Sequence, residues 1–304
     1  MSLLRRLRSR LNMQPLRRVG MDTAQLTDEE RMYIDDRIVE TVRPLLVGRK
    51  LFPIFTLPNA GFVTVRGYKR TDMSQARISL YGQGKNKDRS VKTPFDITVP
   101  VIHKEFIISW RDLEASRASR MPIDAQDAEN AARQCAEEED KLLLTGEYTG
   151  WKALGIEGLA TATGRATQAS AGAWPANSLT DCSAAIAKLE AAGHMGSYAL
   201  ILRSSWAAKL RALVSNTAVK WIDVIKDLFA QGIYVSDSLY TSAGLTTSAL
   251  VVESSQENFE AVIGKDLDVF TQQDEDMNLQ CKVFEVLAPR IKRPASICEL
   301  TTLT

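Results

Sequence analysis

Residues 145–164, TGEYTGWKALGIEGLATATG, contain five glycines. Gly150 and Gly155 have the G-x-x-x-x-G spacing of a phosphate-binding P-loop, but that motif continues with Lys and then Ser or Thr. Ile156 and Glu157 occupy those positions here, and a carboxylate would repel a phosphate group. The stretch therefore argues against a nucleotide site. Its glycines indicate a sharp turn in which one backbone segment approaches another closely.

The residues before this turn predict a long helix from residue 125 to residue 144. Asp124 can cap its start, and Gly146 follows its end. Twenty residues of helix are about 30 Å long. The residues expected to face inward are small, so the helix can lie close to a sheet but needs a broad platform: Ala128, Ala131, Ala132, Cys135 and Ala136. The four acidic residues 137–140 point in different directions around the helix. They therefore predict a solvated or subunit-facing edge of the helix rather than a metal cage.

Composition argues for a globular protein without catalytic or metal chemistry. Of the 304 residues, 45% are hydrophobic and 25% are charged, and no apolar run reaches the length needed to span a bilayer. The four cysteines have no metal-ligand spacing, and they are expected to be reduced and buried in a cytoplasmic chain. Only two histidines are present, and no catalytic signature was found. We expect no catalytic residues, no metal, no cofactor and no membrane contact.

The basic charge is concentrated at the start of the chain. Residues 1–20 carry +6 and the whole chain carries +1, so the remaining residues carry −5. One interpretation is a solvated arm. The other is an arm that contacts a polyanion or a cargo surface through its arginines: Arg5, Arg6, Arg8, Arg10, Arg17 and Arg18.

A helix and a long hairpin are predicted after the arm. Thr27 and Glu30 form a capping box, and apolar residues from Met32 to Val42 then recur at near-helical spacing. Pro44 and Gly48 are expected to end this helix. Strand patterns in 62–68, 76–82 and 95–110 flank a polar, turn-rich tip, and Pro100 should interrupt the returning strand.

The second half of the chain alternates helix and strand patterns. Residues 171–264 predict a compact α/β lobe, and residues 265–304 return to strand patterns. Strands on both sides of this lobe suggest that it is inserted into a discontinuous domain. The expected division is an arm at 1–25, a helix and lead-in strand at 26–65, a hairpin at 66–100, a discontinuous domain at 101–170 and 265–304, and the inserted lobe at 171–264.

The order of these elements resembles the HK97-type capsid fold. Three stretches are similar to the encapsulin family: IDDRIVETVRPLLVGRKLFPIF (34–55), GIEGLATATG (155–164) and VIGKDLDVF (262–270). The resemblance implies an α+β fold with a discontinuous peripheral domain, a long spine helix, an extended E-loop hairpin and an inserted axial domain. The Arg-rich residues 1–25 and Pro53 depart from the family pattern.

The resemblance implies a structural protein whose copies self-assemble into an icosahedral cage around a cargo enzyme. The alternative is the major capsid protein of a tailed virus or provirus, which is found in a virion and packages DNA, with the basic arm as a contact to the nucleic acid. A nucleotide-binding enzyme is the least supported alternative. The resemblance also implies a lumenal docking surface for a short cargo peptide and a loop at a fivefold pore. The docking residues would be Ile34, Ile38, Val42 and Arg49, unless these side chains pack on the subunit core, and the pore residues would be Gly193, His194, Met195 and Gly196.

Overall fold

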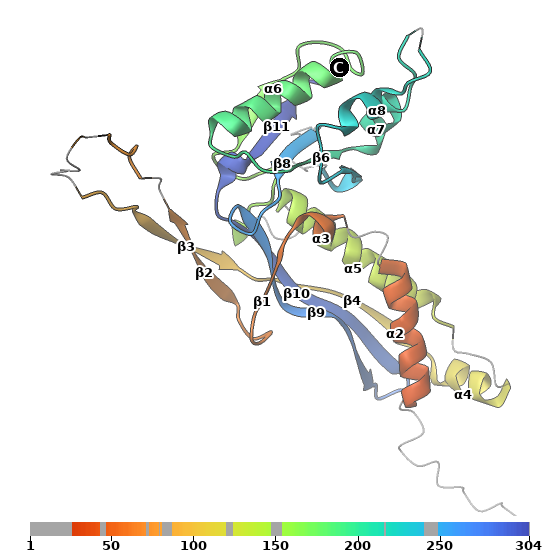
Figure 1. Ribbon diagram of the computed structural model, residues 1–304. Coiled ribbons are helices and arrows are strands. Elements are labelled where there is room, and N and C mark those ends of the chain that lie inside the picture. Colours follow the sequence, from red (N-terminus) through yellow and green to blue (C-terminus); the bar gives the residue numbers. More distant parts are fainter. Residues whose placement is uncertain are drawn as a thin grey trace, which may run out of the picture.

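The computed structural model describes residues 26–42, 47–70, 73–78, 80, 87–119, 124–146, 154–215, 217–239 and 249–303. Figure 1 shows three parts: a body in which long helices lie against a sheet, a second lobe beyond one end of it, and a two-stranded hairpin that projects sideways. The helices are α2 (Asp28–Val42), α3 (Gly48–Leu51), α4 (Trp110–Ser119), α5 (Gln126–Thr145), α6 (Ser178–Ala191), α7 (Ser204–Leu210) and α8 (Trp221–Lys226).

The body contains a four-stranded sheet in the order β1-β9-β10-β4. Its strands are β1 (Ile54–Thr56), β4 (Val101–Ile108), β9 (Phe259–Gln273) and β10 (Leu279–Ile291). One face of the sheet is covered by α5 and α2, and the small residues of α5 are buried against it: Ala128, Ala131, Ala132, Cys135 and Ala136. The expected broad platform beneath a small-residue helix is therefore present.

The second lobe contains a five-stranded sheet in the order β5-β11-β8-β6-β7. Its strands are β5 (Ala166–Ala169), β6 (Tyr198–Leu202), β7 (Ile233–Val235), β8 (Ala249–Glu253) and β11 (Ile297–Thr301). Every residue of β6 is buried. Helix α6 packs on this sheet through Cys182, Ala185 and Leu189.

Two details differ from the predicted domain division. Strands β5 and β11 belong to the sheet of the second lobe, although 166–169 and 297–301 fall in the ranges expected for the peripheral domain. The expected boundary at 264 and 265 lies inside β9, and the whole of β9 belongs to the four-stranded sheet of the body. The body therefore resumes by residue 259, before the expected boundary, because the apolar pattern of residues 259–263 does not show which of the two sheets this strand joins.

The first helix also differs in its end. Helix α2 ends at Val42, and Gly48 begins the short helix α3 instead of terminating the first one. The backbone N–H of Gly48 donates to Asp140 Oδ1 at 2.8 Å, and a Cβ at Gly48 would lie closer than 3.0 Å to the Leu143 side chain. The missing side chain of Gly48 therefore leaves room for the Leu143 side chain where α3 packs on α5.

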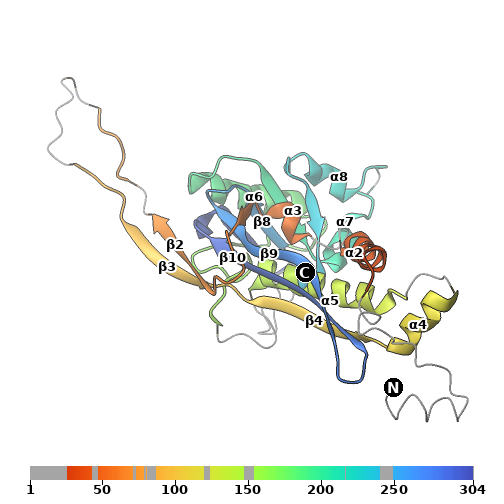
Figure 2. The same cartoon turned by 90° about the horizontal axis from the view of Figure 1, so that it is seen from below.

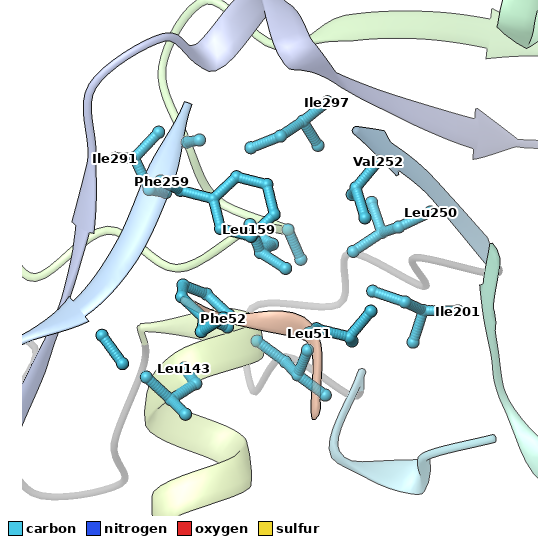
Figure 3. Packing of buried hydrophobic residues seen from close by; sticks show 14 of the residues in the cluster. Leu51, Phe52, Leu143, Leu159, Ile201, Leu250, Val252, Phe259, Ile291 and Ile297 are labelled. Atoms are coloured by element: carbon cyan, nitrogen blue, oxygen red, sulfur yellow. The ribbon is translucent and has the colours of Figure 1, made fainter. Parts of the chain in front are cut away.

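A shared core joins the two lobes. Leu51 and Phe52 from the end of α3 meet Leu143 of α5, Leu159 of the glycine-rich segment and Phe259 at the start of β9 (Figure 3). The rings of Phe52 and Phe259 pack edge to face with their centroids 4.9 Å apart. This junction fixes the direction in which the second lobe leaves the body.

The hairpin is formed by β2 (Thr64–Arg70) and β3 (Lys92–Thr98), which pair antiparallel from Thr64 with Thr98 to Arg70 with Lys92. The chain bends at Val99 and Pro100 and continues as β4, so the predicted interruption at Pro100 is confirmed. Figure 2 shows the hairpin extending away from the rest of the chain.

Candidate functional site

The glycine-rich segment ends α5 and allows two stretches of backbone to pack closely. Gly146 ends α5 in the left-handed conformation with φ 66°. Leu159 N and Ala160 N donate to Leu143 O and Leu144 O, and these bonds use carbonyls that the helix end leaves unpaired. The backbones of Gly146 and Gly158 lie so close that a Cβ on either residue would come nearer than 3.0 Å to the other. The glycines at 146 and 158 are thus explained by close packing, as the sequence predicted, and need no phosphate.

Two of the residues expected to form a docking surface, Ile34 and Ile38, are buried within the subunit. Ile34 and Ile38 are 3% and 4% exposed and pack against α5 and the sheet. This placement corresponds to the alternative in which they belong to the subunit core. The side chain of Val42 lies outside the described residues. Met32, on the same helix, is 65% exposed.

Arg49 is surrounded by three carboxylates rather than by solvent. Its guanidinium lies 2.6 Å from Glu139 Oε1, 3.1 Å from Glu285 Oε2 and 2.5 Å from Asp266 Oδ1. Glu139 and Glu285 are buried, whereas Asp266 is exposed. Arg49 therefore joins α3 to α5, β9 and β10.

The acidic run of α5 is partly buried, contrary to the expectation of a solvated edge. Glu139 and Asp140 are buried, while Glu137 and Glu138 are not fully covered. Burial raises the pKa of Asp140 to about 6, although backbone N–H groups of Gly48 and Val47 donate to it. Burial also raises the pKa of Glu139 and raises that of Glu285 well above its ordinary value.

The predicted pore loop has one buried and one exposed bulky side chain. His194 is 7% exposed, and its Nδ1 lies 2.8 Å from Glu253 Oε2. The carbonyl of His194 accepts a hydrogen bond from Tyr198 Oη at 2.5 Å. Met195 is 80% exposed. Within one subunit, the loop therefore presents Met195 rather than His194 to the surroundings.

Gly196, the second glycine of this loop, lies against the side chain of Glu253. A Cβ at Gly196 would come closer than 3.0 Å to the carboxylate of Glu253, and Glu253 also accepts from Asn258 Nδ2 at 2.9 Å. Gly193 has φ 85° with no atom near its missing Cβ. Glu253 thus fixes both His194 and the end of the loop.

Large apolar side chains are exposed on two surfaces. On the hairpin and its base, Ile78 is fully exposed and the others are largely exposed: Phe62, Val63, Tyr68, Met73, Leu80 and Val91. On the sheet face opposite α5, the exposed residues are Val101, Ile107 and Phe270, with Trp110 and Met277 at the end of the sheet. A two-stranded ribbon is marginally stable alone, and exposed apolar surface of this kind marks interfaces.

Potential metal ligands, cysteines and helices in the described part of the chain bear on metal binding, thiol chemistry and membrane insertion. No group of three or more His, Cys, Asp or Glu there could hold a metal ion. The four cysteines are buried, and burial raises the thiol pKa to about 12 for Cys135 and Cys182 and to about 11 for Cys281 and Cys298. Among the described helices, none is long and apolar enough to cross a membrane.

A family model described as an encapsulating protein for peroxidase matches residues 15–288. The chain belongs to the encapsulin shell-protein family. It is 32% identical over 277 residues to a type 1 encapsulin shell protein of Myxococcus xanthus. The match covers 90% of this chain and 93% of that protein. It is 28% identical to a diheme-cytochrome-encapsulin shell fusion protein of Kuenenia stuttgartiensis, covering 90% of this chain and 73% of the fusion.

Solved structures share the fold of this encapsulin. A virus-like particle from Pyrococcus furiosus has a TM-score of 0.68 at 18% identity and covers 90% of this chain and 98% of its own. The capsid of Myoviridae phage XM1 has a TM-score of 0.64 at 14% identity. The match covers 85% of this chain and 92% of the capsid chain. The fold is the HK97-type capsid fold, as the sequence predicted. The encapsulin is a structural, self-assembling shell protein, so its functional surfaces are those through which copies meet.

Proposed function

We propose that this encapsulin closes into an icosahedral cage in the cytoplasm and encloses a cargo enzyme. The single observation that carries the proposal is the exposed apolar hairpin, because it gains little from its own subunit and requires a neighbouring copy to cover it. Such a contact is heterologous, and closed symmetry keeps heterologous contacts finite.

Charge supports a contact between the hairpin of one copy and the open sheet face of the next. Residues 64–98 contain eight Lys or Arg and three Asp, a net charge of +5. The distal part of the sheet is acidic around Phe270 and Met277: Asp266, Asp268, Asp274, Glu275 and Asp276. Figures 1 and 2 place the hairpin and the β9–β10 turn at opposite ends of the molecule. Opposite charge at opposite ends favours head-to-tail contact between copies.

Enclosure of cargo is supported by the family description and by the encapsulins that the chain resembles. We propose that a short docking peptide of the cargo binds the lumenal surface. Since Ile34 and Ile38 are buried in the subunit, docking at this helix would use exposed residues such as Met32.

A second candidate is a capsid that packages DNA, and the observation that favours it is the Arg-rich arm. Arginines facing the lumen would release counterions from nucleic acid. Shells purified from the cells that make this chain distinguish the two. A stoichiometric protein that resists protease until the shells are opened supports a cargo compartment. Nuclease-resistant DNA of constant length, with no such protein, would support the capsid instead.

A further inference from the structure

The guanidinium of Arg49 is the cation that contacts two buried carboxylates, Glu139 of α5 and Glu285 of β10. Arg49 Nε lies 2.6 Å from Glu139 Oε1, and Arg49 Nη2 lies 3.1 Å from Glu285 Oε2. The side chains of Glu139 and Glu285 are 2% and 1% exposed. The third carboxylate on this arginine, Asp266, is 70% exposed and can be compensated by solvent.

The surrounding elements add no second cation in contact with either buried carboxylate, within the ranges that the structure describes. On α3, Lys50 is exposed and acts on Asp140. On α5, Lys141 pairs with Glu138, and on β9, Lys265 pairs with Asp268. From β4, Lys104 acts on Cys135 of α5. Asp140 is also buried here and receives only backbone N–H groups of α3 and the residue before it.

Each of the two buried carboxylates has one oxygen atom that lacks a hydrogen-bond partner in the described part of the chain. These atoms are Glu139 Oε2 and Glu285 Oε1, and both are buried. Two neighbouring carboxylates in a buried site cannot both ionise without a large cost. A single proton between them would neutralise one charge and give both oxygens a partner.

We propose that Glu285 holds a proton and donates it in a hydrogen bond to Glu139, so that Arg49, Glu139 and Glu285 form a pH-sensitive clamp joining α3 to α5 and β10. Arg49 lies two residues before Leu51 and three before Phe52 in the chain, and both of these residues belong to the junction core. It is a property of the subunit and goes beyond the proposed enclosure of cargo.

The direction of the pH effect follows from burial. The pKa of Glu139 is raised by burial, and that of Glu285 is raised by burial and by the nearby Glu139 charge. A carboxyl group with a raised pKa in the folded state stabilises the fold at low pH, and that contribution is lost as pH rises through the folded pKa. The clamp therefore holds at low pH and weakens as pH rises, because loss of the proton leaves two buried anions facing one guanidinium.

Infrared spectroscopy of the assembled protein tests the proposal directly. We expect the carbonyl band of a protonated carboxylic acid at pH 7, lost in both Glu285→Gln and Glu139→Gln and retained in the control Asp266→Asn. Persistence of the band in either Gln variant, or its absence from the wild type, overturns the shared proton. The wild-type spectrum decides the matter even if a variant does not fold.

Thermal unfolding of the same proteins gives a second readout. Between pH 6 and pH 9 the wild-type midpoint should fall with rising pH, whereas the midpoint of Glu285→Gln should fall less steeply. Asp266→Asn should keep the wild-type slope. Parallel slopes for Glu285→Gln and the wild type would contradict the clamp.

Discussion

A Cβ placed on Gly158 would lie closer than 3.0 Å to the backbone nitrogen of Gly146. These two glycines hold the exit segment against the last turn of the spine helix, with Thr161 Oγ1 donating to Thr145 O at 2.7 Å. We expect Gly158→Ala to lower the thermal midpoint strongly or to prevent folding, because rigid backbone atoms must move. The control is Gly155→Ala, where φ is 63° but no atom lies near the missing Cβ, and which should cost about 1–2 kcal/mol. Equal losses in the two variants would show that close packing at 158 is unimportant.

Removing Arg49 should have a large effect on stability, because its side chain is mostly buried among carboxylates. Arg49→Met leaves Glu139 and Glu285 without their cation, and breaking a buried pair in this way costs about 3–5 kcal/mol. Lys265→Met is the matched control, because its pair with Asp268 is about half exposed and screened by solvent, so it should contribute little to stability. Chemical denaturation at pH 7 compares the two. A loss for Arg49→Met no larger than that for Lys265→Met would mean that the cluster does not support the junction.

The pKa of Asp140 predicts a separate effect of pH. Burial raises it from 3.8 to about 6, a difference of roughly 3 kcal/mol between the two protonation states. Its contribution to stability is present below pH 4 and is lost as pH rises through about 6. Asp140→Asn should therefore reduce the fall in unfolding free energy between pH 5 and pH 7. Asp127→Asn, at an exposed position of the same helix, should leave that fall unchanged.

Much of the fold could be predicted from local pattern. The spine helix was expected at 125–144 and is Gln126–Thr145, because apolar residues recur at helical spacing over about twenty residues between Asp124 and Gly146. The membership of β5 and β11 in the second sheet could not be predicted. The alternation of apolar and polar residues predicts that a segment is a strand. It does not show which distant strand will pair with that segment.

The buried acids could have been recognised from the helix period. The inward residues Ala128, Ala132 and Cys135 continue at Glu139 and Leu142, so Glu139 lies on the same stripe. A carboxylate in such a stripe predicts a buried partner, although its identity as Arg49, ninety residues away, depends on the tertiary fold. The exposed Met195 and buried His194 are one residue apart in a loop, where no period indicates which side chain faces inward.

The hairpin prediction separates assembly from subunit folding. Ile78→Asp places a charge in apolar surface that we propose a neighbour covers, so assembly should fail while the subunit keeps its far-ultraviolet circular dichroism. Gln75→Asp adds the same charge to an exposed polar position of the same segment. Light scattering should show large particles for Gln75→Asp and small species for Ile78→Asp. Large particles in both would remove Ile78 from the interface.

Electron microscopy of this chain expressed alone tests the central claim most directly. The chain should form closed, hollow icosahedral particles without any cofactor or second protein, because the apolar hairpin and the open sheet face are covered only by neighbouring copies. Size-exclusion chromatography of the same sample should then contain little monomer. Monomers or dimers alone at micromolar concentration, with no closed particles on the grid, would contradict the account.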